Sequence, residues 1–419
     1  MKNILFTSTE KAESAGYIWN TLSGLIMAGQ SVLLLIVITR VCGLKTAGVF
    51  SIAYAIANLM LTIGKYGMRN YQVSDVRTEF SFHDYLWSRI ATSTAMVIFS
   101  TGYACFGIFA SGYDANKVLV IILFCLLKTV DAVEDVYFGL YQKKGRLDVG
   151  AKAMTFRLSG TLFVLVLAVT VTRELILSTA ITCIFSSFLC IWMITTTYSY
   201  FREKEKSASF QNVRKLLWEC FPLFAGGYLS IYIGNISKYA IDKYMSEEIQ
   251  ACYNFVFMPV FVVGLISGFA FQPVISKMAV LWKNGDHSGF ARIILEQLAI
   301  VFVILAVVLA GAGILGIPIL SLLYNTDLTP YRGTLMILLI GGGFNAAAVF
   351  YTVVLTVIRR QKAVIWGYFI VAVLSKAASG YFVPHYGING AAVLYLITMG
   401  TVMIAFGCCT IFYQRSSTV

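Results

Sequence analysis

The sequence predicts an all-α integral membrane protein with twelve transmembrane helices. Of its 419 residues, 58% are hydrophobic and only 12% are charged, whereas soluble proteins carry about 45–50% apolar and about 25% charged residues. A span takes roughly 20 residues, so twelve spans use about 240 residues, close to the apolar content. Little chain is left for a soluble domain, and the composition excludes disordered, collagen-like and disulfide-rich secreted proteins.

The first six apolar segments are 15–39, 46–68, 86–110, 118–140, 152–172 and 175–198. Each is long enough to cross a bilayer as a helix. Aromatic residues at their ends, such as Tyr17, Trp87 and Tyr198, are typical of the interfacial belt of membrane helices. Only Thr172, Arg173 and Glu174 separate the fifth segment from the sixth, so this boundary is the narrowest.

The last six apolar segments are 215–240, 250–275, 292–316, 331–356, 362–382 and 388–412. Pro222, Pro259 and Pro273 lie in or near the seventh and eighth segments, where a proline permits a helix to bend. Gly264 and Gly268 fit the spacing of small residues that lets two membrane helices approach closely.

Loop charge predicts the orientation. With a cytoplasmic N-terminus, 21 Lys and Arg residues fall in inner loops, and five fall in outer loops, namely Arg40, Lys45, Lys117, Arg173 and Lys243. Because Lys and Arg gather in cytoplasmic loops, both termini are expected in the cytoplasm. The same rule explains the net charge of +12 without a nucleic-acid partner.

The most polar inner loop, 201–209, divides the spans six and six. We therefore predict an N-terminal lobe at residues 1–200, a cytoplasmic inter-lobe loop at 201–214 and a C-terminal lobe at 215–419. Two halves with the same orientation suit a parallel internal duplication about an axis along the membrane normal.

The fourth segment carries four ionisable residues at membrane depth, Lys128, Asp131, Glu134 and Asp135. Their spacing places Lys128, Asp131 and Asp135 on one helical stripe, with Glu134 beside it. Arg157 lies at a similar depth in the fifth, antiparallel segment and can face Glu134 or Asp135. Intramembrane charges are costly and mark functional sites by default. A structural ion pair and a charged wet cavity both explain the cluster, and the acids suit charge pairing or ion coupling.

Other polar residues inside spans are weaker candidates. Lys376 lies beyond the middle of the eleventh segment with no acid in its own helix, so we expect it to face an aqueous cavity or an anionic ligand. Lys65, Lys238 and Arg332 lie near span ends, where snorkelling explains them. The amides of Asn20, Asn58, Asn235 and Asn345 suit interhelical hydrogen bonds, and Asn20, Asn58 and Asn345 are also candidate substrate contacts.

Several types of chemistry have no visible site. The nine cysteines contain no CxxC pair, and His83, His287 and His385 fall in three separate loops, so no metal site or disulfide framework is expected. No nucleotide-binding loop and no hydrolase motif occurs, so no catalytic residue and no cofactor is predicted. Residues 1–14 are polar and the apolar run after them lacks a cleavage site, so no secretory signal is expected.

Short motifs spread over nearly the whole chain resemble one family of transporters. They include Trp19-Asn20, Arg40-x-x-Gly43-x-x-x-x-Gly48-x-Phe50, Gly67-Met-Arg69-Asn-Tyr71, Phe138-Gly-Leu-Tyr141-Gln142 and Pro384-His-Tyr-Gly387-Ile-Asn389-Gly390. The chain in this respect resembles the polysaccharide transport (Wzx-type) flippases of the multidrug/oligosaccharidyl-lipid/polysaccharide superfamily, which is MATE-like. Its acidic trio in the fourth segment is denser than the family pattern.

The resemblance implies a MATE-like fold with a central cavity and a defined function. The expected function is to move undecaprenyl-pyrophosphate-linked oligosaccharide from the inner to the outer leaflet by alternating access, for the assembly of cell-surface polysaccharide. It implies a multi-pass protein of the bacterial cytoplasmic membrane. The implied partners are the lipid-linked oligosaccharide, membrane lipids, H⁺ or Na⁺ as coupling ion, and polysaccharide assembly proteins.

If this resemblance holds, the candidate substrate-binding residues are Lys128, Arg157, Lys376, Asn20, Asn58 and Asn345. Two alternatives stay open. A cation-coupled multidrug antiporter has the same fold, but its acidic, aromatic-lined cavity would disfavour buried cations such as Lys128. A membrane glycan polymerase or ligase would need a sizeable outer loop, and the longest one here spans only about residues 316–330.

Overall fold

The computed structural model describes residues 5–75, 79–201 and 208–416, which form helices joined by short turns and contain no strand. The chain divides into two compact units, Met1–Tyr228 and Leu229–Val419. Ten helices in the described residues are long and apolar enough to cross a membrane. This multi-pass helical architecture agrees with the prediction from composition.

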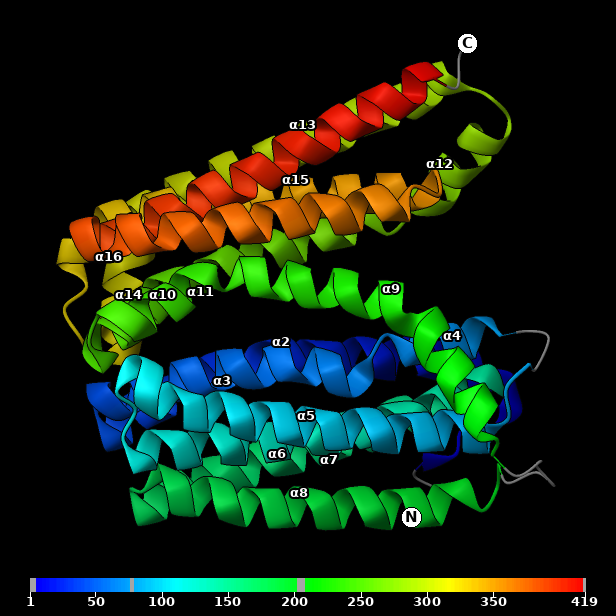
Figure 1. Cartoon of the computed structure of the whole chain (residues 1–419), viewed down its shortest axis with the longest axis horizontal. Helices are drawn as coiled ribbons and strands as arrows, with labels where there is room; N and C mark the ends of the chain where they lie inside the picture. The colour runs from blue at the N-terminus through cyan, green and yellow to red at the C-terminus, as the bar shows by residue number, and fades with distance from the viewer. Residues whose placement is uncertain (1–4, 76–78, 202–207, 417–419) are drawn as a thin grey trace. The chain divides into compact units, whose positions relative to one another are not determined.

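Six long helices and one short one make up most of the N-terminal unit (Figure 1). They are α2 (Ala12–Cys42), α3 (Leu44–Lys65), α4 (Met68–Ser74), α5 (Phe82–Ser111), α6 (Ala115–Lys143), α7 (Leu147–Thr172) and α8 (Leu175–Tyr198), preceded by the 3₁₀ turn η1 (Thr9–Lys11). The narrow boundary between the fifth and sixth predicted spans is real, since Arg173 ends α7 with a left-handed φ of 57°.

Polar residues fix where these helices begin. Ser81 and Asp84 form a reciprocal capping box at the start of α5, and the Asp114 carboxylate accepts a hydrogen bond from the Lys117 amide at the start of α6. Such caps satisfy amides that have no partner within the helix. The apolar segments therefore begin at defined residues, which sets the helical register of the charges on α6.

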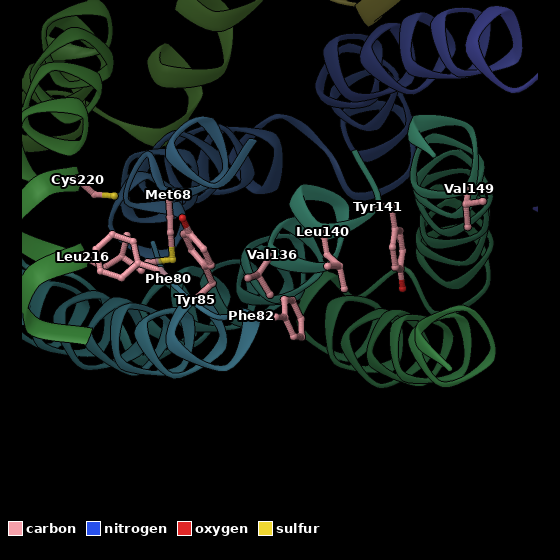
Figure 2. Close-up of a cluster of buried hydrophobic side chains, with 10 residues drawn as sticks. All are labelled: Met68, Phe80, Phe82, Tyr85, Val136, Leu140, Tyr141, Val149, Leu216 and Cys220. Atoms are coloured by element: carbon pink, nitrogen blue, oxygen red, sulfur yellow. The ribbon is translucent and has the colours of Figure 1, made fainter. Parts of the chain in front are cut away.

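One end of the N-terminal unit is closed by a cluster of buried apolar side chains (Figure 2). It combines Met68, Phe80, Phe82, Tyr85, Val136, Leu140, Tyr141, Val149, Leu216 and Cys220. Leu216 and Cys220 belong to the first part of α9 (Phe210–Gly234), which packs on this unit and also bonds to it, since Ser209 N and Asn212 Nδ2 donate to Asp84. The cluster thus anchors the start of α9.

The C-terminal unit takes up the chain from Leu229. After α9 it contains α10 (Ile236–Tyr244), α11 (Glu247–Phe271), α12 (Val274–Lys283), α13 (His287–Gly311), a π-helical turn η2 (Ala312–Gly316), α14 (Ile317–Tyr324), a 3₁₀ turn η3 (Thr329–Tyr331), α15 (Arg332–Val357) and α16 (Gln361–Ser416). The seventh predicted span, 215–240, is not one helix, because Asn235 interrupts it between α9 and α10.

The span count follows from two details of the helices. α16 contains a kink at Gly387, with φ 58° and ψ −138°, and Figure 1 shows its two limbs folding back along each other. α6 is as long as its neighbours but does not number among the ten apolar spans because of its charged residues. Counting α6 and both limbs of α16 gives, within the described residues, the twelve crossings that the sequence predicts.

The predicted division into two lobes falls at the loop 201–214. Residues 202–207 of the predicted inter-lobe loop lie outside the described residues, and α9 begins at Phe210, inside the predicted range 201–214. Contacts assign the chain up to Tyr228 to the first unit. The division at 201–214 stays a prediction.

Candidate functional site

The four ionisable residues of α6 are all buried inside the N-terminal unit. Lys128 is 4% exposed, Asp131 8%, Glu134 5% and Asp135 7%. Full burial of a charge away from water costs several kcal/mol unless it is paired or hydrogen-bonded. The partners of these four side chains therefore decide what the cluster can do.

Arg157 on α7 joins two of the acids. Its Nη2 lies 2.6 Å from Asp131 Oδ1, and its Nε donates to Glu134 Oε2 at 2.7 Å. Nη1 donates to the Ser186 hydroxyl on α8 at 3.1 Å. The guanidinium is therefore held on three sides by α6 and α8, and of the two acids considered from the sequence it faces Glu134, with Asp131 beside it, and not Asp135.

Lys128 shares Asp131 with Arg157. Its Nζ lies 3.0 Å from Asp131 Oδ2 and 5.1 Å from the centre of the Tyr54 ring on α3. One carboxylate thus neutralises part of two cations, and the aromatic face adds a cation–π contact to the ammonium. The pair of Lys128 with Asp131 joins two residues that the sequence places on one helical stripe.

Asp135 pairs with a second group of cations, about one helical turn along α6 from the first group, which consists of Lys128, Asp131, Glu134 and Arg157. Arg89 of α5, only 1% exposed, donates from Nη2 to Asp135 Oδ2 at 2.9 Å and from Nη1 to the Gly64 carbonyl at 2.5 Å. Lys65 Nζ and Arg69 Nη1 lie 3.9 and 3.8 Å from Asp135 Oδ1. Their side chains are 31% and 25% exposed, so these two cations also reach solvent or a ligand.

Sequence reasoning missed this second group. It counted Arg69 and Arg89 as charges of inner loops and Lys65 as a snorkelling residue. The signal that could have found it is depth, because Arg89 lies in the third turn of α5 and Asp135 lies near the matching end of the antiparallel α6. Residues at the same depth in adjacent antiparallel helices can meet. Arg89 and Asp135 do so near the helix ends, and Arg157 and Glu134 do so deeper in the bundle.

A small pocket opens beside the group formed by Lys128, Asp131 and Arg157. It is narrow, with a cavity volume of about 20 Å³, which is room for about one water molecule. Lys128, Asp131 and Arg157 supply its charged wall, and its remaining lining is Gln30, Leu34, Tyr54, Phe124, Leu127, Leu158, Thr161, Leu162 and Leu165. Because Glu134 also pairs with Arg157, the two cations and two carboxylates of this group balance, and the pocket offers an amide, a hydroxyl and charged atoms to a polar group.

The family of the chain can be assigned by comparison with known proteins. The family model described as "Polysaccharide biosynthesis protein" matches residues 14–279, which is more than half of the chain and includes the whole charge network. The chain belongs to this family. No curated protein matches it.

Several solved structures share the fold of this chain. An inward-facing multidrug resistance MATE transporter of the MOP superfamily superposes with a TM-score of 0.72 at 12% identity, over 93% of this chain and 95% of that one. Lipid II flippase MurJ in an inward closed conformation gives 0.70 at 15% identity, over 93% and 87%. A MOP superfamily transporter from Pyrococcus furiosus gives 0.61 at 12% identity, over 99% and 98%. The likeness confirms the predicted MATE-like fold.

The remaining candidate residues are not among those that line the pocket. Asn20 on α2 is exposed, and Asn58 on α3 and Asn345 on α15 are half-buried. Lys376 on the first limb of α16 is exposed and forms no ion pair in the described part of the chain. The structure thus brings Lys128 and Arg157 together at one pocket and leaves the other four predicted substrate contacts outside it.

Proposed function

We propose that this protein is a flippase that moves undecaprenyl-pyrophosphate-linked oligosaccharide from the inner to the outer leaflet by alternating access. One observation carries the proposal. The charge network of the N-terminal unit holds five cations against three carboxylates, namely Lys65, Arg69, Arg89, Lys128 and Arg157 against Asp131, Glu134 and Asp135. The excess of two positive charges belongs to the group around Asp135, where Lys65 and Arg69 are partly exposed, and it suits an anionic substrate.

The sign of this charge separates the two transport functions. A multidrug antiporter must stabilise organic cations, which the two excess positive charges would repel. A pyrophosphate would instead gain charge-assisted hydrogen bonds from Lys and Arg. The MOP superfamily transporter from Pyrococcus furiosus is described as having a binding pocket of reverse polarity, which suggests a different function for that protein. Charge polarity therefore favours the flippase.

Each part of the network has its own role in the proposal. Lys128 and Arg157 present positive charge to the pocket, while Gln30 and Thr161 in its wall offer hydrogen bonds to sugar or phosphate oxygens. Lys65 and Arg69 share one carboxylate and remain partly exposed, so they have charge to spare for a phosphate. We retain Lys376, Asn20, Asn58 and Asn345 as contacts for the polar part of the substrate.

The three acids then act by charge pairing. Asp131, Glu134 and Asp135 each lie within 3.0 Å of a buried cation, so their first effect is to hold Arg157, Lys128 and Arg89 in place. Removing one partner of such a pair leaves a buried uncompensated charge. The acids therefore position the cations that meet the substrate.

The cellular setting follows from the same proposal. The chain would lie in the bacterial cytoplasmic membrane with both termini in the cytoplasm, as the loop charges predict. A gradient of H⁺ or Na⁺ would drive turnover, and polysaccharide assembly proteins would take up the exported unit. Support for a lipid-linked substrate comes from the fold, which carries lipid II flipping in MurJ. A glycan polymerase or ligase finds no support among the structural neighbours, which are described as a transporter and a flippase.

The test is translocation in reconstituted vesicles. Undecaprenyl-pyrophosphate carrying a fluorescently tagged oligosaccharide is placed in both leaflets, and a membrane-impermeant quencher reports how fast the inner pool becomes accessible. We expect faster equilibration with the wild-type protein than with protein-free vesicles, and wild-type rates with the control Lys283→Gln, a change in the last turn of α12. Vesicles that transport ethidium but leave the lipid-linked sugar in place would establish the antiporter instead.

A further inference from the structure

The break in the seventh span places a lysine in the interior of the C-terminal unit. Asn235, with φ −113° and ψ 7°, separates α9 from α10, and its Nδ2 donates to the Ile231 carbonyl at 3.0 Å. Lys238 is the third residue of α10 and is only 5% exposed. Interrupted membrane helices are tolerated where the irregular backbone borders a cavity or an ion site.

Two aromatic rings of α11 lie against the Lys238 ammonium. Its Nζ lies 4.4 Å from the centre of the Phe257 ring and 5.7 Å from that of Phe261, both on α11. In the part of the chain that the structure describes, Lys238 makes no ion pair with a carboxylate, in contrast to Lys128, which has Asp131 at 3.0 Å. The first turn of a helix is also unfavourable for a positive charge. Burial and the position in the first helical turn thus disfavour the ammonium form of Lys238, whereas the two aromatic rings favour that form.

The same face of α11 presents two amides without partners. Gln250, Asn254, Phe257 and Phe261 follow at intervals of four, three and four residues, so they form one stripe along the helix. Gln250 is 1% and Asn254 3% exposed, and neither amide atom of Gln250 nor Oδ1 of Asn254 has a hydrogen-bond partner among the described residues. Since buried polar atoms are nearly always satisfied, these point to water or a ligand against this face of α11.

The other ionisable groups nearby do not neutralise Lys238. α10 packs against α11 and α16. Besides Lys238, the titratable residues of α10 are Tyr239, Asp242, Lys243 and Tyr244, those of α11 are Glu247, Glu248, Cys252 and Tyr253, and those of α16 include Lys376, Tyr381, His385, Tyr386 and Tyr395. None of them forms an ion pair with Lys238 in the described residues. Tyr395 on α16 packs against Phe257, with the two ring centres 5.1 Å apart.

From these observations we propose that Lys238 is a proton-binding site of the C-terminal unit, with Gln250 and Asn254 holding the water that carries the proton. The amine takes a proton from a hydronium ion to give the ammonium and water, and the reverse step returns it. Phe257 and Phe261 stabilise the ammonium, and the surrounding apolar side chains stabilise the amine. A site whose charged form is positive and which has no carboxylate repels Na⁺, so the ligand is the proton.

This assignment deepens the proposed function, on which its coupling role rests. Loading Lys238 changes the charge of the C-terminal unit by one, so a conformation that exposes the site to one side of the membrane would be favoured by the proton concentration on that side. The inference thereby selects H⁺ over Na⁺ among the coupling ions considered. Proton binding itself can be measured without any substrate.

The direct experiment observes the lysine side chains of the full-length protein in nanodiscs. With ¹³Cε-labelled lysine, the chemical shift of each side chain reports its ionisation, and the signal lost in Lys238→Arg identifies Lys238. We expect this signal to titrate between about pH 5 and 9. Ordinary lysines titrate near pH 10.4. A Lys238 signal that remains ionised up to about pH 9.5 would overturn the proposal.

A second experiment tests coupling with two variants of fixed charge. Lys238→Met is always neutral and Lys238→Arg is always charged, whereas Lys243→Met on the same helix is the matched control. In proteoliposomes with the tagged lipid-linked oligosaccharide, both Lys238 variants should lose at least tenfold of the rate increase caused by an imposed pH gradient, while exchange without a gradient persists. An unchanged gradient response would refute the coupling role. Failure of all proteins to translocate the sugar would contradict the proposed function and leave the titration result standing.

Discussion

Arg157 on α7 donates through Nε to Glu134 on α6 at a distance of 2.7 Å, and both side chains are buried at the depth of the membrane spans. The pair fixes α6 to α7 at the level of the pocket. Because Asp131 lies 2.6 Å from the same guanidinium, the arginine serves two acids at once. The stability of this region therefore depends on Arg157 more than on either acid alone.

The first prediction concerns this pairing. Arg157→Met should destabilise the protein by about 3–5 kcal/mol, because it leaves two buried acids with only Lys128 nearby. Glu134→Gln should cost less, since Arg157 keeps Asp131. The exchange of Arg157→Glu with Glu134→Arg should recover part of the loss, as the two charges still attract, although Asp131 now faces a glutamate. The readout is thermal unfolding in detergent.

The structure provides a matched control for this exchange. Asp135 lies one residue from Glu134 but pairs with Arg89 and not with Arg157. Arg157→Glu combined with Asp135→Arg should therefore recover nothing over the single changes. Equal recovery of stability by both exchanges would mean that the network accepts the arginine at either position, and that the specific pair of Arg157 with Glu134 matters little.

A second prediction addresses the close contact behind Arg89. A Cβ on Gly64 would lie 2.7 Å from Met96 Sδ and 2.9 Å from Ala132 Cβ, and the Gly64 carbonyl accepts bonds from Arg89 and Thr92. Gly64→Ala should therefore destabilise the protein by about 1–3 kcal/mol, because α3 must move away from α5 and α6. Thermal unfolding measures the change.

The control for Gly64 lies in the neighbouring helix. Gly24 in α2 has no heavy atom within 4 Å of an added Cβ. Gly24→Ala should leave stability within about 1 kcal/mol of the wild type, on the stabilising side. If Gly64→Ala behaved in the same way, the packing of α3 against α6 would be looser than the distances indicate.

A third prediction concerns acid stability through Asp75, just after α4. Burial raises the pKa of its carboxyl, but the amides of Glu79 and Phe80 and the ammonium of Lys143 together lower that pKa below the ordinary aspartate value. A depressed pKa in the folded state contributes stability above the unfolded value of about 3.9, and this stability is lost as the pH falls through the folded value.

The expected outcome follows from that sign. Asp75→Asn should melt at a lower temperature than the wild type at pH 7, and the gap should close as the pH falls below about 4. Asp327→Asn, which removes an exposed carboxyl that accepts from Thr329, should show a smaller gap at pH 7, because solvent screens an exposed carboxylate. A gap for Asp75→Asn that stays constant from pH 7 to about pH 3 would exclude an electrostatic origin.

Much of the fold was predictable because apolar runs of membrane length leave few alternatives. The order of the spans and the α6 charge stripe follow from spacing alone. The break at Asn235 was not predicted, because Ile231, Ile233 and Ile236 carry the apolar pattern past this polar residue. As a result Lys238 was interpreted as a snorkelling residue, whereas it is 5% exposed inside the C-terminal unit.

The partners of the charges were less predictable than their positions. Helical spacing gives the face of α6 on which Asp135 lies, but not the rotation of α5 that brings Arg89 to it at 2.9 Å. Likewise, the absence of an acid in the helix of Lys376 says nothing about its exposure, which depends on how the first limb of α16 packs. Side-chain pairing between helices needs their relative rotation, which a single sequence does not encode locally.

The last prediction tests the cation at the pocket. Lys128→Gln removes one positive charge while Asp131 keeps Arg157 at 2.6 Å, so the acid is not left unpaired and the fold should persist. If Lys128 meets the pyrophosphate, its loss removes a charge-assisted hydrogen bond worth roughly 1.5–3 kcal/mol, or about a 10- to 100-fold lower translocation rate. Lys376→Gln, the exposed candidate on α16, should lower the rate by the same mechanism if it also contacts the substrate. Both variants are compared with Lys283→Gln at equal protein level in the vesicle assay. Wild-type rates for Lys128→Gln would remove this residue from the site, and translocation would then have to depend on Lys65 and Arg69.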